Sequence, residues 1–130
     1  MKYKTLYSLF IFLLIIGCKK ENFYWNLRKN PDNTPIISTT VVSNITTTSA
    51  LSGGTVSYEG GGPITQRGIV WSKTQNPTLS NNHTSNGIGI GGFSSSITGL
   101  DPSTKYYVKA YATNSFGTYY GNQFLLKTPK

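Results

Sequence analysis

The residue best suited to covalent chemistry is Cys18, the only cysteine in the chain. Because there is no second cysteine, the chain cannot close a disulfide within itself. Acylation, a free thiol and a bridge to another molecule remain as alternatives. Cys18 directly follows the apolar run from Leu6 to Ile16 and the small residue Gly17. We therefore predict that its thiol is a lipid attachment point.

The segment before Cys18 has the composition of an export signal. It begins with two lysines, continues through the apolar run and ends at Gly17. The run is much shorter than the roughly 20 apolar residues that a transmembrane helix needs, and two further lysines follow Cys18. We therefore expect residues 1–17 to be a removed signal peptide rather than a membrane-spanning helix.

The tetrapeptide Ile15-Ile16-Gly17-Cys18 resembles the lipobox of bacterial lipoprotein signal peptides. The resemblance implies cleavage between Gly17 and Cys18, a thioether-linked diacylglycerol on Cys18 and a further fatty acyl chain, such as palmitate, on the new amino terminus. Two or three acyl chains anchor a protein stably, because each buried methylene contributes about 0.8 kcal/mol. Lys19 replaces the aspartate that retains lipoproteins in the inner membrane. We therefore expect the outer membrane of a Gram-negative envelope, in either leaflet.

The chain carries a net charge of +8, and four of its cations follow closely behind Cys18. They predict either a tether that rests on anionic headgroups, with each cation contributing on the order of 1 kcal/mol, or a solvated linker. From Ile36 onward the basic residues are spread rather than clustered, so we expect no nucleic-acid partner. We assign residues 18–35 to a lipidated tether and linker. The four cations are Lys19, Lys20, Arg28 and Lys29.

The sequence beyond the tether offers little for catalysis or for metal binding. It contains one histidine, His83, and two acids, Glu59 and Asp101. Acyl transfer needs a nucleophile with an oriented base, glycoside hydrolysis needs two paired carboxyl groups, and calcium prefers several carboxylates. His83 falls in a predicted exposed loop, and both acids fall in predicted turns. We therefore expect no enzyme, no metal and no cofactor.

The segment Gly87–Gly92 matches the G-x-G-x-x-G expression of dinucleotide-binding loops. That motif binds phosphate only between a strand and a helix whose N-terminus receives the ligand. Here the strand-like segment Phe93–Ile97 follows the glycines. We interpret the segment as a flexible edge or loop and expect no nucleotide.

The elements that position these residues are predicted to be β-strands. Beyond Pro35 the chain is rich in Thr, Ser, Val, Ile and Tyr, and it shows no helical period. Seven strands in about a hundred residues are typical of an immunoglobulin-like sandwich, so we predict one all-β domain over residues 36–130. We expect strands at 36–42, 49–58, 66–73, 93–98, 105–113 and 118–128, with a short edge strand between 83 and 90.

Leu100, Pro102, Thr104 and Tyr106 form the pattern L-x-P-x-T-x-Y, which resembles the tyrosine corner of fibronectin type III domains. The resemblance implies that the Tyr106 hydroxyl bonds to backbone a few residues upstream and fastens a crossover between two sheets. It also implies a fibronectin type III-like, seven-stranded sandwich. Other stretches resemble the fibronectin-like repeat of bacterial surface and secreted proteins, namely 49–56, 67–72, 76–79 and 106–114.

Alternation of side chains along each strand divides the domain into a core and an outer surface. We expect an inward-facing core of Leu51, Val56, Ile69, Trp71, Ile97, Leu100, Tyr106, Val108, Ala110, Tyr120, Phe124 and Leu126. The expected outer surface, our candidate binding surface, consists of Tyr107, Lys109, Tyr111, Tyr119 and Leu125, with Val70 beside them.

Such an outer surface serves either as a stabilising aromatic ladder or as a contact surface. We predict a non-enzymatic, membrane-anchored surface lipoprotein whose fibronectin-like domain makes protein–protein contacts at the cell envelope or outside the cell. One alternative is a glycan-binding module that uses Tyr107, Tyr111 and Tyr119 as a platform. A passive structural spacer is another.

Overall fold

The structure is a computed structural model that describes residues 33–130. The predicted signal peptide, its cleavage site at Gly17 and the acylated Cys18 lie outside the described residues, so these remain predictions. Residues 33–130 contain no helix that is long and apolar enough to cross a membrane. Their seven strands are β1 (Ile36–Ser43), β2 (Ala50–Tyr58), β3 (Gln66–Ser72), β4 (Asn82–His83), β5 (Gly91–Ile97), β6 (Lys105–Asn114) and β7 (Gly117–Lys127).

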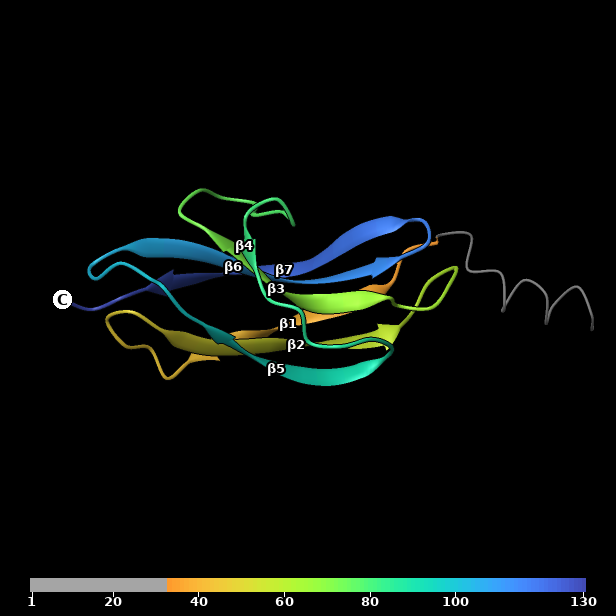
Figure 1. Cartoon of the computed structure of the whole chain (residues 1–130), viewed down its shortest axis with the longest axis horizontal. Coiled ribbons are helices and arrows are strands. Elements are labelled where there is room, and N and C mark those ends of the chain that lie inside the picture. Colours follow the sequence, from red (N-terminus) through yellow and green to blue (C-terminus); the bar gives the residue numbers. More distant parts are fainter. Residues whose placement is uncertain (1–32) are drawn as a thin grey trace, which may run out of the picture. The chain divides into compact units, whose positions relative to one another are not determined.

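The strands form two antiparallel sheets that pack face to face (Figure 1). One sheet has the order β1-β2-β5 and the other has the order β4-β3-β6-β7. The prediction of an all-β, seven-stranded sandwich is confirmed. The expected strand ends agree with the observed ones to within two residues, except at β4, which ends at His83, where the expected edge strand begins.

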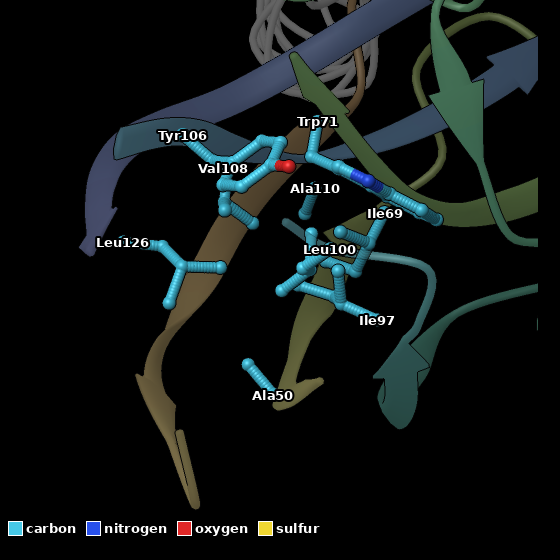
Figure 2. Close-up of a cluster of buried hydrophobic side chains, with 9 residues drawn as sticks. All are labelled: Ala50, Ile69, Trp71, Ile97, Leu100, Tyr106, Val108, Ala110 and Leu126. Atoms are coloured by element: carbon cyan, nitrogen blue, oxygen red, sulfur yellow. The ribbon is translucent and has the colours of Figure 1, made fainter. Parts of the chain in front are cut away.

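The core fills the space between the two sheets, where Trp71 and Tyr106 supply the largest side chains (Figure 2). Gly54 brings β2 close to β6, since a Cβ added at Gly54 would lie only 2.7 Å from that of Ala110. The buried cluster consists of Ala50, Ile69, Trp71, Ile97, Leu100, Tyr106, Val108, Ala110 and Leu126.

The prediction of Leu51 as a core residue is wrong. Leu51 is 38% exposed, whereas its neighbour Ala50 is 3% exposed. β2 pairs with β5 without a register shift from Ala50 to Val56. Residues an odd number of positions apart in an unbroken strand face opposite sides, so Leu51 cannot share the inward face with Val56.

A β-bulge in β7 places both Gly121 and Asn122 opposite Ala110 of β6. Thr39 of β1, in the other sheet, inserts its hydroxyl there. The hydroxyl accepts a hydrogen bond from the Ala110 N–H (2.9 Å) and donates one to the Asn122 carbonyl (2.6 Å). A Cβ added at Gly121 would lie 2.8 Å from the Thr39 hydroxyl, so the close approach requires glycine. Thr39 therefore links the two sheets with polar contacts.

The same bulge reverses the facing of the β7 residues that precede it. Tyr120 pairs with Tyr111 on the outer face, and Tyr119 pairs with Ala112, which is buried on the inner face. Directly paired residues project to the same side of a sheet. The predictions that Tyr119 faces outward and Tyr120 inward are therefore wrong.

The buried amide of Asn114 gathers the start of the described chain and two loops at one end of the sandwich. Its Nδ2 donates to the carbonyls of Asn33 and Glu59, at 3.0 Å each, and its Oδ1 accepts from the Phe116 N–H at 2.9 Å. We call this the Asn33 end. The opposite end, where β3 and β7 finish and the C-terminus lies, is the Lys130 end (Figure 1).

Candidate functional site

The connection between β3 and β4, residues 73–81, packs on the outer face of the sheet and covers part of the predicted outer surface. The Leu79 N–H donates to the Tyr120 hydroxyl at 2.9 Å. The Asn76 N–H donates to Oε1 of Gln123 at 2.7 Å. Because Tyr120 and Gln123 both belong to β7, the connection crosses the sheet from β3 to its far edge.

Lys109 also binds the β3–β4 connection, so its side chain does not project freely into solvent. Its ammonium group donates to Oδ1 of Asn76 at 3.0 Å and lies 5.9 Å from the centre of the Tyr120 ring, within the range of a cation–π contact. Pro77 is fully buried in the connection. The predicted cationic member of the binding surface therefore holds a loop of the same chain.

Tyr111 and Val70 face outward but are completely buried, so neither belongs to an exposed surface. The Tyr111 hydroxyl donates to the Thr84 carbonyl and accepts from Nε2 of Gln66 at 3.0 Å. The His83 ring stands perpendicular to the Tyr111 ring at 6.1 Å, and His83 pairs with Val70 across β4 and β3. Burial raises the pKa of the Tyr111 hydroxyl. The prediction of an exposed Tyr111 is wrong because β4 and its continuation cover it.

What remains of the predicted surface is the cross-strand pair of Tyr107 and Leu125. Tyr107 is half-buried, and Leu125 is 56% exposed. Since Tyr111 is covered and Tyr119 faces inward, the three tyrosines do not form one exposed platform. The proposed glycan platform is therefore absent from this face.

A groove of about 560 Å³ opens beside this pair at the Lys130 end. It lies between the last residues of β3, the β3–β4 connection and the tyrosine corner. No local sequence pattern indicates this groove, because its walls come from segments far apart in the sequence. They consist of Trp71, Ser72, Lys73, Thr74, Ser80, Asn81, Asn82, Gly99, Asp101 and Tyr106.

The tyrosine corner fixes one wall of this groove. The Tyr106 hydroxyl accepts a hydrogen bond from the Asp101 N–H at 2.8 Å, and the Asp101 carbonyl accepts one from the Thr128 hydroxyl at 2.6 Å. The backbone of Asp101 is thus held on both sides, while its carboxylate reaches Nζ of Lys73 at 2.6 Å. The hydrogen bond and charge of Lys73 lower the pKa of Asp101, and the same partner effects raise the pKa of Lys73.

The other residues of the corner motif support this arrangement. Leu100 is buried in the core. The Thr104 N–H donates to the Thr128 hydroxyl at 2.9 Å, and the Thr104 hydroxyl donates to the Pro102 carbonyl at 2.9 Å. These contacts join the approach to β6 with the residue after β7, so the corner closes the Lys130 end.

The groove is equipped for polar recognition. Its rim carries one ammonium group, one carboxylate, two asparagine side chains and several hydroxyls, and it contains neither histidine nor cysteine. A volume of about 560 Å³ is within the roughly 300–1,000 Å³ of ordinary ligand sites. These groups can donate and accept hydrogen bonds from a polar side chain or a small polar ligand.

The glycine-rich segment holds a cation of the same chain. Arg67 donates from Nε to the Asn86 carbonyl (3.1 Å) and from Nη1 to the carbonyls of Gly89 (3.1 Å) and Ile90 (3.0 Å). A phosphate site presents N–H groups, whereas this segment presents carbonyl oxygens. Its last two residues, Gly91 and Gly92, already belong to β5. The segment is therefore a crossover between the sheets.

No protein-family model and no curated protein sequence matches the chain. Several solved structures are similar to it. The sensor domain of the anti-sigma factor RsgI4 from Pseudobacteroides cellulosolvens is 23% identical, with a TM-score of 0.54, and the match covers 73% of this chain and 94% of that one. A fibronectin type III domain of human collagen XX is 20% identical, with a TM-score of 0.53 and coverage of 75% and 94%.

The sixth fibronectin type III domain of a human fibronectin type III domain containing protein is also similar, at 22% identity and a TM-score of 0.53, with coverage of 74% and 87%. At these identities the likeness concerns the fold. The strand order and the tyrosine corner agree with it. Residues 33–130 therefore have the fibronectin type III-like sandwich fold.

Proposed function

We propose that the chain is a non-enzymatic lipoprotein of the bacterial cell envelope whose fibronectin type III-like domain binds another protein through its Lys130 end. Its anchor is the acylated Cys18 that the lipobox resemblance implies. The fold supports a binding or sensor role, because the similar solved structures are fibronectin type III domains and a sensor domain.

One observation carries the proposal: the groove adjoins the cross-strand pair of Tyr107 and Leu125, which no loop of residues 33–130 covers. Ser72 lines the groove and pairs with Tyr107, which pairs in turn with Leu125. A half-buried aromatic and an exposed leucine thus lie beside a polar groove. Protein interfaces combine these features, with aromatic and apolar residues at the centre and polar groups at the rim.

The proposal is tested with the acylated protein in its native envelope. A photo-reactive side chain at Thr74, on the rim of the groove, should crosslink the partner. The double variant Tyr107→Ala and Leu125→Ala should reduce the crosslinked product several-fold, because truncation of central interface residues weakens binding most. Val41→Ala, which removes an equally exposed apolar side chain from β1, is the matched control.

Mass spectrometry of Cys18 tests the anchor separately. A crosslinked product that persists in the double variant would contradict the role of Tyr107 and Leu125 in binding. The absence of any crosslinked product from the unsubstituted protein would favour a passive spacer. An exported protein with an unmodified thiol would contradict the lipoprotein assignment.

A further inference from the structure

The two ends of the sandwich differ sharply in their side chains. Five of the charged residues within 33–130 lie at the Lys130 end, namely Lys73, Asp101, Lys105, Lys127 and Lys130. Exposed apolar side chains occur at both ends, and those at the Asn33 end are Ile36 (56%), Ile88 (70%), Ile90 (60%) and Phe116 (55%). Among residues 33–130, the charged residues at the Asn33 end are Glu59 and Arg67. The two ends therefore differ in charge.

The charged side chains at the Asn33 end, those of Arg67 and Glu59, make hydrogen bonds within the domain. Arg67 is bound to the carbonyls of the glycine-rich segment and lies 5.3 Å from the centre of the Phe93 ring. The Glu59 carboxylate accepts from the Ile64 N–H at 3.4 Å. Both charged residues are only partly exposed, and the four apolar side chains are more exposed than either.

The protruding side chains belong to loops that pack on one another. The Gly89 N–H donates to the Ile64 carbonyl at 3.0 Å, which joins the glycine-rich segment to the β2–β3 loop. A Cβ added at Gly61 of that loop would lie 2.6 Å from the Phe116 ring. The β2–β3 loop thus stands between the isoleucines and the phenylalanine, and all three loops form one surface.

Arg67 fixes the shape of this surface. Its bonds to the carbonyls of Gly89 and Ile90 hold the backbone on which Ile88 and Ile90 are mounted. An apolar surface whose backbone is already ordered loses little conformational entropy when it is buried. The isoleucines are therefore presented in a form suited to insertion.

The residue at which the N-terminal segment joins the domain supports a specific occupant for this surface. The chain enters the domain at Asn33, whose carbonyl is bound by the same asparagine that holds the Phe116 turn. The roughly fifteen residues between Cys18 and Asn33 reach at most about 50 Å when fully extended. They include the four cations at positions 19, 20, 28 and 29, which complement anionic headgroups.

We propose that the Asn33 end docks on the lipid surface that holds Cys18, with Ile88, Ile90 and Phe116 inserted at the boundary between headgroups and acyl chains. The proposal rests on the acylation of Cys18 stated under the proposed function. Apolar side chains on a rigid loop surface bind at this depth, and attached acyl chains keep the domain near it. The Lys130 end and its groove then face away from the membrane.

The test uses the full acylated protein in vesicles of phosphatidylethanolamine and phosphatidylglycerol. The variant Ile88→Cys can be labelled with an environment-sensitive fluorophore, because the thioether at Cys18 does not react. We expect a blue-shifted emission that brominated acyl chains quench. The same label at Thr74→Cys, on the exposed rim of the groove, should emit as in water and escape quenching.

A matched pair of variants separates insertion from simple proximity. With the label at Phe116→Cys, the double change Ile88→Ser and Ile90→Ser should reduce quenching several-fold. The double change Val41→Ser and Leu51→Ser, which removes exposed apolar side chains from β1 and β2, should leave quenching unchanged.

A water-like emission at position 88 on a protein whose Cys18 is acylated would overturn the docking and leave the lipoprotein assignment intact. Protection of position 88 in native envelopes but not in pure lipid vesicles would identify a protein as the occupant and would equally overturn it. An unmodified Cys18 would remove the lipoprotein assignment, and the docking with it.

Discussion

At the scale of single residues, the direction of a hydrogen bond decides what a substitution removes. Tyr106 accepts from the Asp101 N–H, although the corner resemblance by itself does not tell donor from acceptor. A phenylalanine at position 106 would therefore leave a backbone N–H without its partner. Burial makes this costly, because Tyr106 is only 5% exposed.

We expect Tyr106→Phe to lower the free energy of unfolding by about 1–3 kcal/mol, the usual cost of an unsatisfied buried polar group. Urea denaturation followed by tryptophan fluorescence measures this change. Tyr107→Phe, at the next position and on the outer face, is the control and should cost much less. Equal midpoints for Tyr106→Phe and the wild type would contradict the role of the hydroxyl.

At the scale of elements, the connection between β3 and β4 behaves as a cover for one sheet face. It covers outward-facing residues that would otherwise be solvated, and Tyr120, Gln123 and Lys109 hold it in place. Of the tyrosines expected to be exposed on this face, Tyr111 is covered by β4 and the residues after it, and Tyr119 faces inward. The remaining exposed part of the predicted surface, Tyr107 and Leu125, lies where the connection does not reach.

Tyr120→Phe removes the acceptor that binds the Leu79 N–H. We expect this amide to exchange its hydrogen up to about tenfold faster, since a net hydrogen bond contributes roughly 0.5–1.5 kcal/mol and about 1.4 kcal/mol corresponds to a factor of ten. Hydrogen exchange followed by nuclear magnetic resonance measures the effect. Tyr119→Phe, on the inner face, should leave the Leu79 amide unchanged. Equal exchange rates in all three proteins would show that the hydroxyl does not hold the connection.

Sequence reasoning located the strands because their composition and turn residues are local features. It also identified the core position of Trp71, which alternation fixes once the strand is known. It failed at Tyr119 and Tyr120, because the bulge in β7 depends on Thr39 from the other sheet. It failed at Tyr111 for a related reason, since the segment that buries Tyr111 is more than twenty residues away. Neither the contact of Thr39 with β7 nor the covering of Tyr111 can be recognised from a local sequence pattern.

At the scale of the whole molecule, the stability of the domain should depend on alkaline pH through Tyr111. Burial raises the pKa of this hydroxyl above its ordinary value of 10.0. A group whose pKa is raised on folding stabilises the folded state fully below the unfolded pKa. That contribution is lost as the pH rises above about 10, where the unfolded chain releases the proton first.

We therefore expect the unfolding midpoint of the wild type to fall more steeply above pH 10 than that of Tyr111→Phe, which has no proton to lose at this position. Tyr111→Phe should be less stable at neutral pH, because it loses its contacts with Thr84 and Gln66. Urea midpoints between about pH 8 and pH 11 measure both effects. Tyr107→Phe should keep the slope of the wild type, and parallel profiles for all three proteins would contradict the assignment.

The Asn114 amide has a mechanical consequence for a protein pulled from its N-terminal segment. Tension applied at Asn33 loads the hydrogen bond from Asn114 Nδ2 to the Asn33 carbonyl before it reaches β1. Because Asn114 is the last residue of β6, an inner strand of the four-stranded sheet, part of the force passes into the middle of that sheet. The edge strand β1 is thereby shielded from peeling away first.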